Sequence, residues 1–375
     1  MRIALVCTEK LPVPPVKGGA IQTYIDGVLP FLAARHEVTV VGRSDPALPD
    51  RERAGGIRYV RLPADDGPEP YADAVAAFLR TERWDVVECF NRPAFVERFA
   101  SAAPGARLIL SMHNEMFQPH RLPPQRARRV LGLVDTVVTI SDFIGRGIAR
   151  LYPGAAPKLR TIRSGVDLDR FRPGPHPSEA ALRERYGLGD HPVILSVGRL
   201  SAKKGIHLVL AAMERVRLTH PEAVLLQVGS RWYGRDDEDD YVQAIKRHAA
   251  DLGDAVRLTG YVPYAEIDGY FGLADLFVCA SQWQEPLARV HYEAMAAGLP
   301  VITTDRGGNA EVVTEGHNGL IVRPHDRVEL FAAAMQTLLD DQPLRERLGR
   351  AGRELAEAHF GWERVARELL GTLEG

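Results

Sequence analysis

The sequence contains little cysteine, no excess of either charge and no long apolar run. Its three cysteines, Cys7, Cys89 and Cys279, lie far apart and show neither Cys-x-x-Cys nor Cys/His spacing. This pattern argues against a disulfide framework or a structural zinc site and favours a reducing, cytoplasmic environment. The formal net charge of -2 gives no reason to expect a nucleic acid as partner. No stretch approaches the roughly 18 apolar residues of a membrane span, so we expect a soluble protein.

The first residues lack the features of a secretory signal peptide. The apolar run Ile3–Cys7 is short, and Thr8-Glu-Lys10 interrupts it at once. A signal peptide needs a longer apolar core and a cleavage site with small residues. We therefore interpret this run as the first β-strand.

The composition, 45% hydrophobic and 26% charged over 375 residues, is that of a folded protein with two domains of about 150 residues or more. Short apolar runs alternate with segments of helical spacing, which predicts α/β domains whose parallel sheets are covered on both faces. The predicted strands are Ile3–Cys7, Val38–Val41, Asp85–Cys89, Leu108–Ser111, Thr136–Ile140, Val193–Val197, Ala223–Val228, Val256–Leu258, Leu276–Cys279 and Val301–Thr304. The predicted helices are Ile21–Ala34, Tyr71–Arg80, a helix from Asp142, Gly205–Leu218, Tyr241–Leu252 and a helix from Trp362.

The proline-rich segment Arg172-Pro-Gly-Pro-His-Pro177 divides the chain, because such dense prolines stop both helix and sheet. We expect one Rossmann-like domain at 1–170, with a C-terminal helix at 362–375 crossing back to it, and a second at 171–361. No internal repeat or low-complexity tract is present. Ligands of open α/β sheets bind outside the carboxyl ends of the strands. We therefore expect the functional site in a cleft between two facing domains.

Two carboxylates eight residues apart mark the second half. Pro286 suits the first position of a helix and Gly298 its C-terminal cap, with Glu285 just before the helix and Glu293 within it. Such a helix start binds anions through unpaired N–H groups. Glu285 would accept hydrogen bonds from sugar hydroxyls and Glu293 would hold a ribose diol. Alternatively, Glu285 is an ordinary acidic residue at the start of a buried helix. The unpaired N–H groups would belong to Leu287, Ala288 and Arg289.

Two basic residues follow another predicted strand. Arg199 and Lys204 lie in the loop that opens the helix from Gly205, where both would converge on a diphosphate. Basic groups aimed at developing charge stabilise a transition state. The alternative is that both side chains are simply solvated in a loop.

Two features of the first half follow predicted strands as well. The pair Gly18–Gly19 would let the backbone approach a phosphate or sugar without obstruction by a side chain, or it forms a flexible turn. His113 follows another predicted strand, from which it would hydrogen-bond a bound sugar. A single histidine is otherwise more often structural.

Two charged runs have simpler interpretations. Asp236-Asp-Glu-Asp-Asp240 contains Asp-x-Asp, a pattern that can hold a divalent metal, but it directly precedes a predicted helix whose dipole favours acidic residues. No metal site is predicted. A basic run within residues 121–129 would attract an anionic or lipid-linked acceptor, although a solvated helix face is the simpler interpretation. The run consists of Arg121, Arg126, Arg128 and Arg129.

Together these motifs resemble glycosyltransferase family four, whose members have the GT-B fold of two facing Rossmann-like domains. The resemblance covers nearly the whole chain, with Glu285 and Glu293 matching the family's E-x7-E motif. It implies catalytic roles for Arg199, Lys204, Glu285 and His113. It implies donor binding by Gly18, Gly19, Gly198, Tyr261, Val262, Pro286, Leu287, Ala288, Arg289 and Glu293.

Four longer segments look like a narrower group, the glycosyltransferases associated with the spore coat of spore-forming bacteria. They are Thr8–Pro14, Cys89–Pro93, His113–Phe117 and Gln282–Glu293. One departure from the wider family is Leu287-Ala288, where the usual motif has Phe-Gly after Glu285-Pro286. An alanine keeps its backbone N–H for a phosphate, and the adjoining Arg289 is expected to reach the donor or the acceptor.

The resemblance implies a retaining transfer of a sugar from a nucleotide-diphosphate donor, most simply a UDP-sugar, to a glycan or lipid-linked acceptor. No cofactor or metal is expected, and membrane contact would be at most peripheral. Arg199, Lys204 and the amides of Gly19 and Leu287 would stabilise the departing phosphate. The resemblance implies a role for this reaction in spore-coat or cell-surface polysaccharide synthesis. Two alternatives are a nucleotide-sugar 2-epimerase and a catalytically silent coat or scaffold protein, whereas the absence of Gly-x-Gly-x-x-Gly disfavours a dehydrogenase.

Overall fold

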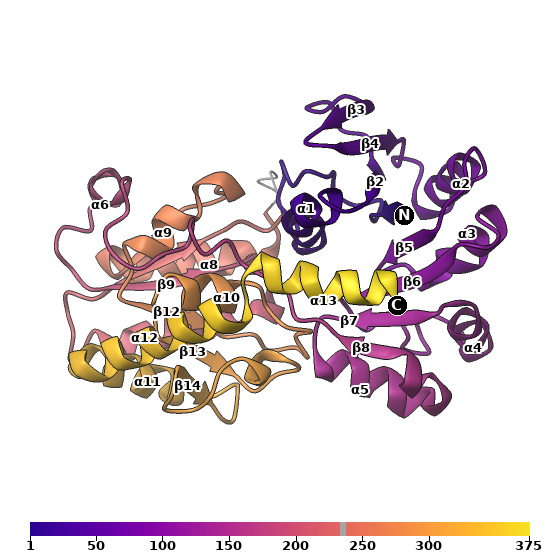
Figure 1. Cartoon of the computed structure of the whole chain (residues 1–375). Coiled ribbons are helices and arrows are strands. Elements are labelled where there is room, and N and C mark those ends of the chain that lie inside the picture. Colours follow the sequence, from indigo (N-terminus) through magenta and orange to yellow (C-terminus); the bar gives the residue numbers. More distant parts are fainter. Residues whose placement is uncertain (233–237) are drawn as a thin grey trace. The chain divides into compact units, whose positions relative to one another are not determined.

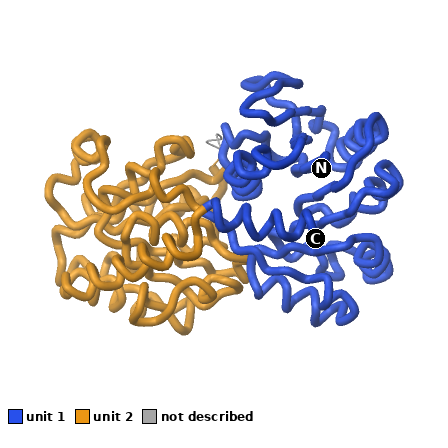
Figure 2. Tube along the Cα trace, in the orientation of Figure 1, with its two compact units in different colours: residues 1–165, 362–375 blue, residues 166–361 orange. Residues whose placement is uncertain are grey.

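The computed structural model describes residues 1–232 and 238–375, which form two compact units (Figure 2). Unit 1 comprises Met1–Gly165 and Trp362–Gly375, and unit 2 comprises Val166–Gly361. The division therefore follows Gly165 and not residue 170. Val166 already belongs to unit 2 because it forms a β-bridge with Gly361 and its N–H donates to the Phe360 carbonyl at 2.8 Å. The proline-rich segment lies inside unit 2.

Unit 1 is built on an eight-stranded sheet of order β3-β4-β2-β1-β5-β6-β7-β8 (Figure 1). All neighbouring strands are parallel except β3, which is antiparallel to β4. The strands are β1 (Arg2–Val6), β2 (Glu37–Arg43), β3 (Arg51–Ala54), β4 (Ile57–Leu62), β5 (Val86–Phe90), β6 (Arg107–Met112), β7 (Thr136–Thr139) and β8 (Leu159–Thr161). β3, β4 and β8 were not predicted, because these strands carry arginines where a buried parallel strand has apolar residues.

Helices cover both faces of this sheet. They are α1 (Ala20–Ala33), α2 (Pro68–Leu79), α3 (Val96–Ala102), α4 (Pro124–Leu133), α5 (Asp142–Leu151) and α13 (Trp362–Glu374). Apolar residues of α1 and α13 form one core with the strands, so the last helix of the chain completes the core begun by the first. Trp362 fixes this packing. A Cβ on Gly27 of α1 would lie 2.3 Å from its ring and one on Gly165 would lie 2.5 Å from it, so both positions require glycine.

Unit 2 contains a six-stranded sheet of order β11-β10-β9-β12-β13-β14, in which all neighbours are parallel. Its strands are β9 (Val193–Val197), β10 (Val224–Val228), β11 (Val256–Leu258), β12 (Leu276–Cys279), β13 (Val301–Thr304) and β14 (Gly319–Val322). Its helices are α6 (Glu179–Tyr186), α7 (Ile206–Val216), α8 (Asp240–Asp251), α9 (Asp268–Gly272), α10 (Val290–Ala296), α11 (Val328–Asp340) and α12 (Gln342–His359). Residues of α7, α8 and α11 pack on the strands in one apolar core. The two mostly parallel sheets confirm the predicted α/β class.

Each sheet has a point where successive connections leave in opposite directions. In unit 1 this point lies between β1 and β5, and in unit 2 it lies between β9 and β12. Because such a switch point leaves a crevice at the carboxyl ends of its two strands, it is where α/β sheets bind ligands. The loops after these four strands are therefore the first places to look for a site.

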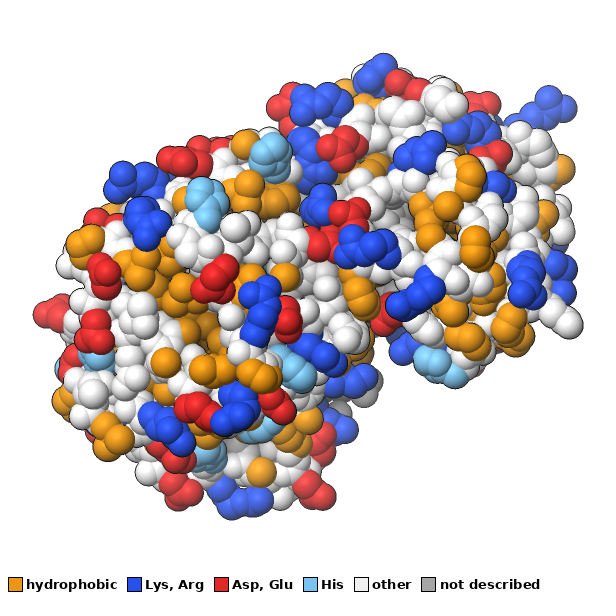
Figure 3. All heavy atoms as spheres, turned by 90° about the horizontal axis from the view of Figure 1, so that it is seen from below, with side chains coloured by type: hydrophobic (Ala, Val, Ile, Leu, Met, Phe, Trp, Pro, Cys, Tyr) orange, Lys and Arg blue, Asp and Glu red, His pale blue; other side chains and the backbone are white. Residues whose placement is uncertain are grey.

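The surface carries both signs of charge. On the face shown in Figure 3, acidic and basic side chains are interspersed and neither forms a continuous field, which fits the formal net charge of -2. No helix in the described ranges is both long and apolar enough to cross a membrane. Cys7, Cys89 and Cys279 are buried free thiols.

Candidate functional site

In unit 2 the loops after β9 and β12 are held against each other. Gly205, which ends the short 3-10 helix Ala202–Lys204, has φ 70°, and a Cβ there would lie 2.0 Å from the Ala280 carbonyl oxygen. The N–H of Gln282 donates to the Lys203 carbonyl at 2.8 Å. Only glycine permits this approach, and it brings the lysine loop and the glutamate loop together.

The Glu285 carboxylate is the centre of this arrangement. Its Oε2 accepts hydrogen bonds from Lys204 Nζ at 2.6 Å, Trp283 Nε1 at 2.8 Å and Ser281 Oγ at 2.9 Å. The residue is only 6% exposed. Burial alone would raise the pKa of this carboxyl, but Lys204 and the other donors hold it below its ordinary value. Glu285 is therefore an ionised acceptor, and no described residue donates to its other oxygen, Oε1.

The backbone of Glu285 is fixed by residues that the sequence analysis missed. The N–H of Gly308 donates to the Glu285 carbonyl at 2.8 Å. Gly307 has φ 63°, and a Cβ there would lie 1.9 Å from the same oxygen. The available signal was a glycine pair in the loop after a predicted strand, as at Gly18–Gly19.

The helix predicted from Pro286 is wrong in its first part. The helix α10 begins only at Val290, although Gly298 follows its end with φ 75° as expected. The side chain of Asn309 intervenes, because its Oδ1 accepts the Ala288 N–H at 3.3 Å. The Ala288 amide is thus used within the protein, which corrects its predicted availability. The amide of Leu287 has no acceptor among the described residues.

Arg199 follows β9 as predicted, in the same loop that leads to Lys204. Its guanidinium lies 4.8 Å above the ring of Trp232. Gly198 precedes it, and a Cβ on Gly229 would approach the Gly198 carbonyl oxygen to 2.3 Å, so the ends of β9 and β10 are tightly packed.

Three more of the predicted donor-binding residues, Tyr261, Val262 and Glu293, come from other elements of unit 2. Tyr261 and Val262 are half-buried in the loop after β11. Glu293 is 3% exposed on α10, and Arg289 Nη2 lies 3.0 Å from its Oε1. One nitrogen of this guanidinium, Nη2, is engaged with Glu293, and the role of Arg289 toward the donor or the acceptor stays a prediction.

In unit 1 the predicted glycine pair lies between β1 and α1. Gly18 and Gly19 have φ 80° and 109°, and a Cβ on Gly19 would meet the side chain of Gln22 at 2.3 Å. The Gly18 N–H closes a turn on the Pro15 carbonyl at 2.8 Å. No described residue accepts the N–H of Gly19, which directly precedes the 14-residue helix α1.

His113 directly follows β6 and is 6% exposed. Its backbone N–H donates to Asn91 Oδ1 at 3.2 Å, and its ring meets the Tyr24 ring edge-on at a centroid distance of 5.1 Å. Asn91 itself has φ 55°, a left-handed conformation that few residues other than glycine adopt. The end of β5 therefore positions the histidine.

A buried ion pair at the same strand ends had not been predicted. Arg92 donates from Nη2 to Glu9 Oε1 at 2.6 Å and from Nε to Glu9 Oε2 at 2.7 Å. Burial opposes ionisation of Glu9, but Arg92 holds the pKa of this carboxyl below its ordinary value. The pair joins the loops after β1 and β5, at the switch point of unit 1. Both residues lie in segments singled out by the family resemblance, so a signal was present.

The charged runs have mostly structural contacts. Asp239 caps α8, its Oδ1 accepting the Val242 N–H at 2.9 Å, whereas Asp236 and Asp237 lie outside the described residues. Within the described part of the chain, no three His, Cys, Asp or Glu side chains are grouped to hold a metal ion.

In the basic run, two of the four arginines bind one acidic residue. Arg126 and Arg129 lie 2.7 Å and 3.1 Å from Glu97. The run is therefore partly neutralised within unit 1.

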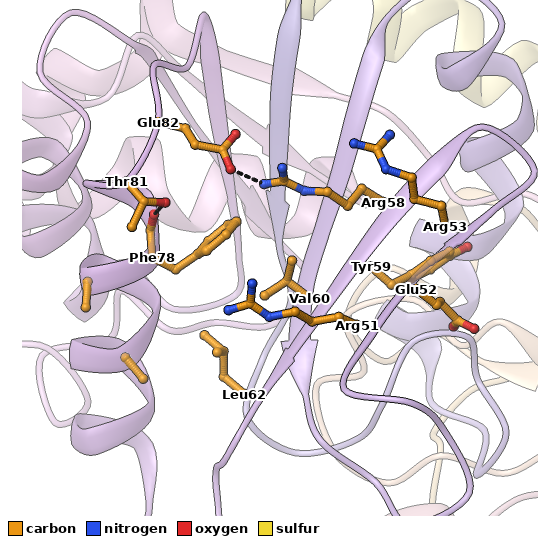
Figure 4. Close-up of a pocket in the computed structure, with 12 residues that line it drawn as sticks. Arg51, Glu52, Arg53, Arg58, Tyr59, Val60, Leu62, Phe78, Thr81 and Glu82 are labelled. Carbon is orange, nitrogen blue, oxygen red and sulfur yellow. Dashed lines mark hydrogen bonds and ion pairs between the residues drawn. The ribbon is translucent and has the colours of Figure 1, made fainter.

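Two cavities of the structure contain none of the predicted site residues. One of about 710 Å³ lies in unit 1 between the β3–β4 hairpin and α2, with Arg51, Arg53 and Arg58 around an apolar floor (Figure 4). Arg58 donates to Glu82 there at 2.7 Å. The other, of about 350 Å³, lies in unit 2 beside His191. A concave pocket is the usual first candidate for a site, but the chemistry here lies at the strand ends.

Comparison with known proteins identifies the family. Residues 19–165 match the glycosyl transferase 4-like domain and residues 178–355 match the glycosyl transferases group 1. Spore coat protein SA of Bacillus subtilis is 43% identical over 100% of this chain and 99% of its own length. A GDP-mannose-dependent alpha-(1-6)-phosphatidylinositol monomannoside mannosyltransferase of Mycobacterium tuberculosis is 32% identical over 100% of this chain and 98% of its own length. The chain belongs to the group 1, GT4-like glycosyltransferases.

Solved structures agree on the fold. The Anabaena protein Alr3699/HepE in complex with UDP-glucose has a TM-score of 0.80 at 21% identity and covers 100% of this chain and 99% of its own. Sucrose-phosphate synthase from Thermosynechococcus elongatus has a TM-score of 0.82 at 24% identity and covers 100% of this chain and 98% of its own. These neighbours are GT-B glycosyltransferases, which confirms the predicted GT-B fold. The predicted glycosyltransferase activity is confirmed by the family match and the curated relatives.

Proposed function

We propose that this glycosyltransferase moves a sugar from a UDP-sugar to a hydroxyl of a glycan or lipid-linked acceptor, with retention of configuration and without a metal. One observation carries the proposal: Lys204 Nζ lies 2.6 Å from Glu285 Oε2 at the switch point of unit 2. A cation beside an ionised acceptor suits a ligand that combines a phosphate with sugar hydroxyls.

Unit 2 is the donor domain in this proposal. Lys204, Arg199 and the amide of Leu287 bind the diphosphate, and Oε1 of Glu285 accepts hydrogen bonds from the sugar hydroxyls. Glu293 takes the ribose, and Tyr261–Val262 lie toward the base. Gly198 and Pro286–Ala288 shape the two loops that carry these groups.

The chemistry follows from where charge develops. As the C1–O bond of the donor stretches, the sugar becomes oxocarbenium-like and negative charge builds on the leaving phosphate. Fixed cations and amide dipoles stabilise that charge without reorganising, which is the largest contribution in many enzymes. The acceptor hydroxyl attacks from the same face and passes its proton to the leaving phosphate oxygen. The unit 1 groups, His113 and Gly18–Gly19, are assigned to the sugar and its phosphate.

The donor is tested by a thermal-shift screen with UDP-, GDP- and ADP-sugars. A ligand at about 100 times its Kd stabilises the folded state by roughly 2.7 kcal/mol, a readily measured shift. We expect the largest shift with a UDP-sugar, as the UDP-glucose complex of Alr3699/HepE supports. A larger shift with GDP-mannose, the donor named for the mycobacterial relative, would overturn the choice of base.

The reaction type is tested by incubating the protein with the preferred donor. NMR of the product should show the donor's anomeric configuration, and an excess of EDTA should leave the rate unchanged. Inversion or loss of activity with EDTA would refute the respective part of the proposal. An epimer formed without acceptor would identify a 2-epimerase, and the absence of both transfer and donor hydrolysis would identify a silent scaffold protein.

The biological setting proposed is spore-coat or cell-surface polysaccharide synthesis on the cytoplasmic side. The full-length similarity to spore coat protein SA supports it. Peripheral membrane contact through the basic run within 121–129 is the expected mode for a lipid-linked acceptor. Loss of vesicle binding after neutralising that run would test this contact.

A further inference from the structure

The second carboxylate of unit 2 is held by a cluster of its own. Arg289 Nη2 lies 3.0 Å from Glu293 Oε1, and the Tyr264 hydroxyl donates to the same oxygen at 3.3 Å. The two donors are themselves joined, because Arg289 Nη2 donates to the Tyr264 hydroxyl oxygen at 2.8 Å. These side chains come from α10 and its preceding residue and from the 3-10 helix Tyr264–Glu266, which follows β11.

The cluster is rigid and largely dry. The side chains of Arg289 and Glu293 are 11% and 4% exposed. Tyr264 lies between two guanidinium groups, with Arg170 4.6 Å and Arg289 5.6 Å from its ring centroid. Arg170 is fixed in turn by Asp268, whose Oδ1 lies 2.6 Å from its Nη2. Cation–π contacts of this kind add stability when the groups are desolvated.

Arg289 and Tyr264 both donate to Oε1 of Glu293, and neither donates to Oε2. No described residue donates to Oε2. Burial raises the pKa of Tyr264 to about 12, so its hydroxyl remains a donor at neutral pH. The carboxylate is consequently fixed in orientation, with one oxygen satisfied inside the protein and the second able to accept from a ligand.

We infer that Arg289 and Tyr264 are positioning residues that aim Glu293 Oε2 at the ribose of the donor, making the ribose 2′-hydroxyl a determinant of nucleotide affinity. The inference rests on the proposed function, in which Glu293 binds the ribose. A site preorganised around a buried polar group discriminates strongly against an analogue that lacks the matching hydroxyl, because the buried group is then left unpaired.

A single nitrogen of Arg289, Nη2, reaches both the Glu293 carboxylate and the Tyr264 hydroxyl oxygen. The purely structural alternative is that the cluster only ties α10 to the segment after β11, in which case its loss would lower stability and leave nucleotide selectivity unchanged.

The test compares the dissociation constants of UDP and 2′-deoxy-UDP by calorimetry, with GDP and 2′-deoxy-GDP in parallel. We expect the wild type to prefer the ribonucleotide by about 10- to 100-fold, the range for a hydrogen bond to a charged group. Tyr264→Phe keeps the ring and removes the donor, so the preference should fall about 3- to 10-fold, and Arg289→Gln should lower it further. Arg170→Gln is the matched control, since Arg170 contacts Tyr264 but not Glu293, and it should keep the preference.

The outcomes distinguish a failure of the ribose assignment of Glu293 from a failure of the positioning role of Arg289 and Tyr264. If the wild type binds no nucleotide, or binds ribo- and deoxyribonucleotides equally, the assignment of Glu293 to the ribose fails. If the wild type discriminates and both Tyr264→Phe and Arg289→Gln retain its full preference, the positioning role is refuted while the proposed function stands. Thermal melts of each variant show whether it is folded.

Discussion

Replacing Lys204 by alanine perturbs the proposed mechanism at its most defined point. The change removes the cation 2.6 Å from Glu285 Oε2 and leaves the bonds from Ser281 and Trp283. Loss of one preorganised donor to a developing oxyanion costs about 10²- to 10³-fold in turnover. We therefore expect kcat/KM for the donor to fall by at least this factor. The neighbouring Lys203→Ala is the control, because that side chain lies over the Trp283 ring at 5.2 Å.

The Lys204→Ala substitution should also change how the stability of the protein depends on pH. In the wild type Lys204 holds the pKa of buried Glu285 below its ordinary value of 4.5, so the pair stabilises the fold above that pH and this contribution is lost as the pH falls through the folded pKa. In Lys204→Ala burial prevails and the pKa rises, so ionisation now destabilises the variant as the pH increases. The difference between the two proteins should be small near about pH 4 and grow toward about pH 7.

The size of the stability loss in Lys204→Ala follows from the environment of the Glu285 carboxylate. The Lys204 side chain is 24% exposed and two neutral donors remain, so we expect about 2 kcal/mol and not the larger cost of an isolated buried charge. For a unit of this size that corresponds to roughly 4–8 °C in Tm. Donor turnover and thermal melts across this pH range measure both effects. Near-normal turnover in Lys204→Ala, or a Tm difference that does not change with pH, would contradict the assignment.

Three further predictions concern two closely packed glycines, Gly307 and Gly27, and one buried carboxyl, Glu88. Gly307→Ala places a methyl group 1.9 Å from the Glu285 carbonyl oxygen and should abolish detectable donor binding. Gly316→Ala is the control, because Gly316 has a similar φ of 69° but open space around it. This control should lower the unfolding free energy by only about 1 kcal/mol and keep donor binding. Gly27→Ala collides with the Trp362 ring at 2.3 Å and should lower the unfolding free energy of unit 1 by about 1–3 kcal/mol in urea titrations; an unchanged midpoint would refute the packing role. Burial raises the pKa of Glu88 from 4.5 to about 7, so the wild type should lose about 3 kcal/mol as the pH rises between these values. The same titrations on Glu88→Gln should show no such loss, and a persisting slope would exclude Glu88 as its source.

The architecture could be predicted because buried parallel strands leave a simple record. Runs such as Ile3–Cys7 and Val193–Val197 are apolar on both faces, and glycines or charged residues follow them directly. Local pattern is enough to place such strands in order. It was not enough for the exposed edge strand β3, or for its neighbour β4, where Arg58 and Arg61 interrupt the apolar run although Arg61 is buried.

The sequence by itself determined the two-unit α/β class, the order of the chemistry-bearing loops and the pairing of Glu285 with Glu293 as a motif, since each depends on residues close together in the chain. Tertiary structure alone decided which groups are in contact. Gly307 packs against the Glu285 carbonyl, Arg92 forms an ion pair with Glu9, and Asn309 accepts the Ala288 N–H before the start of α10. These contacts join segments that fold side by side although they are distant in sequence, and a single sequence contains no measure of that proximity.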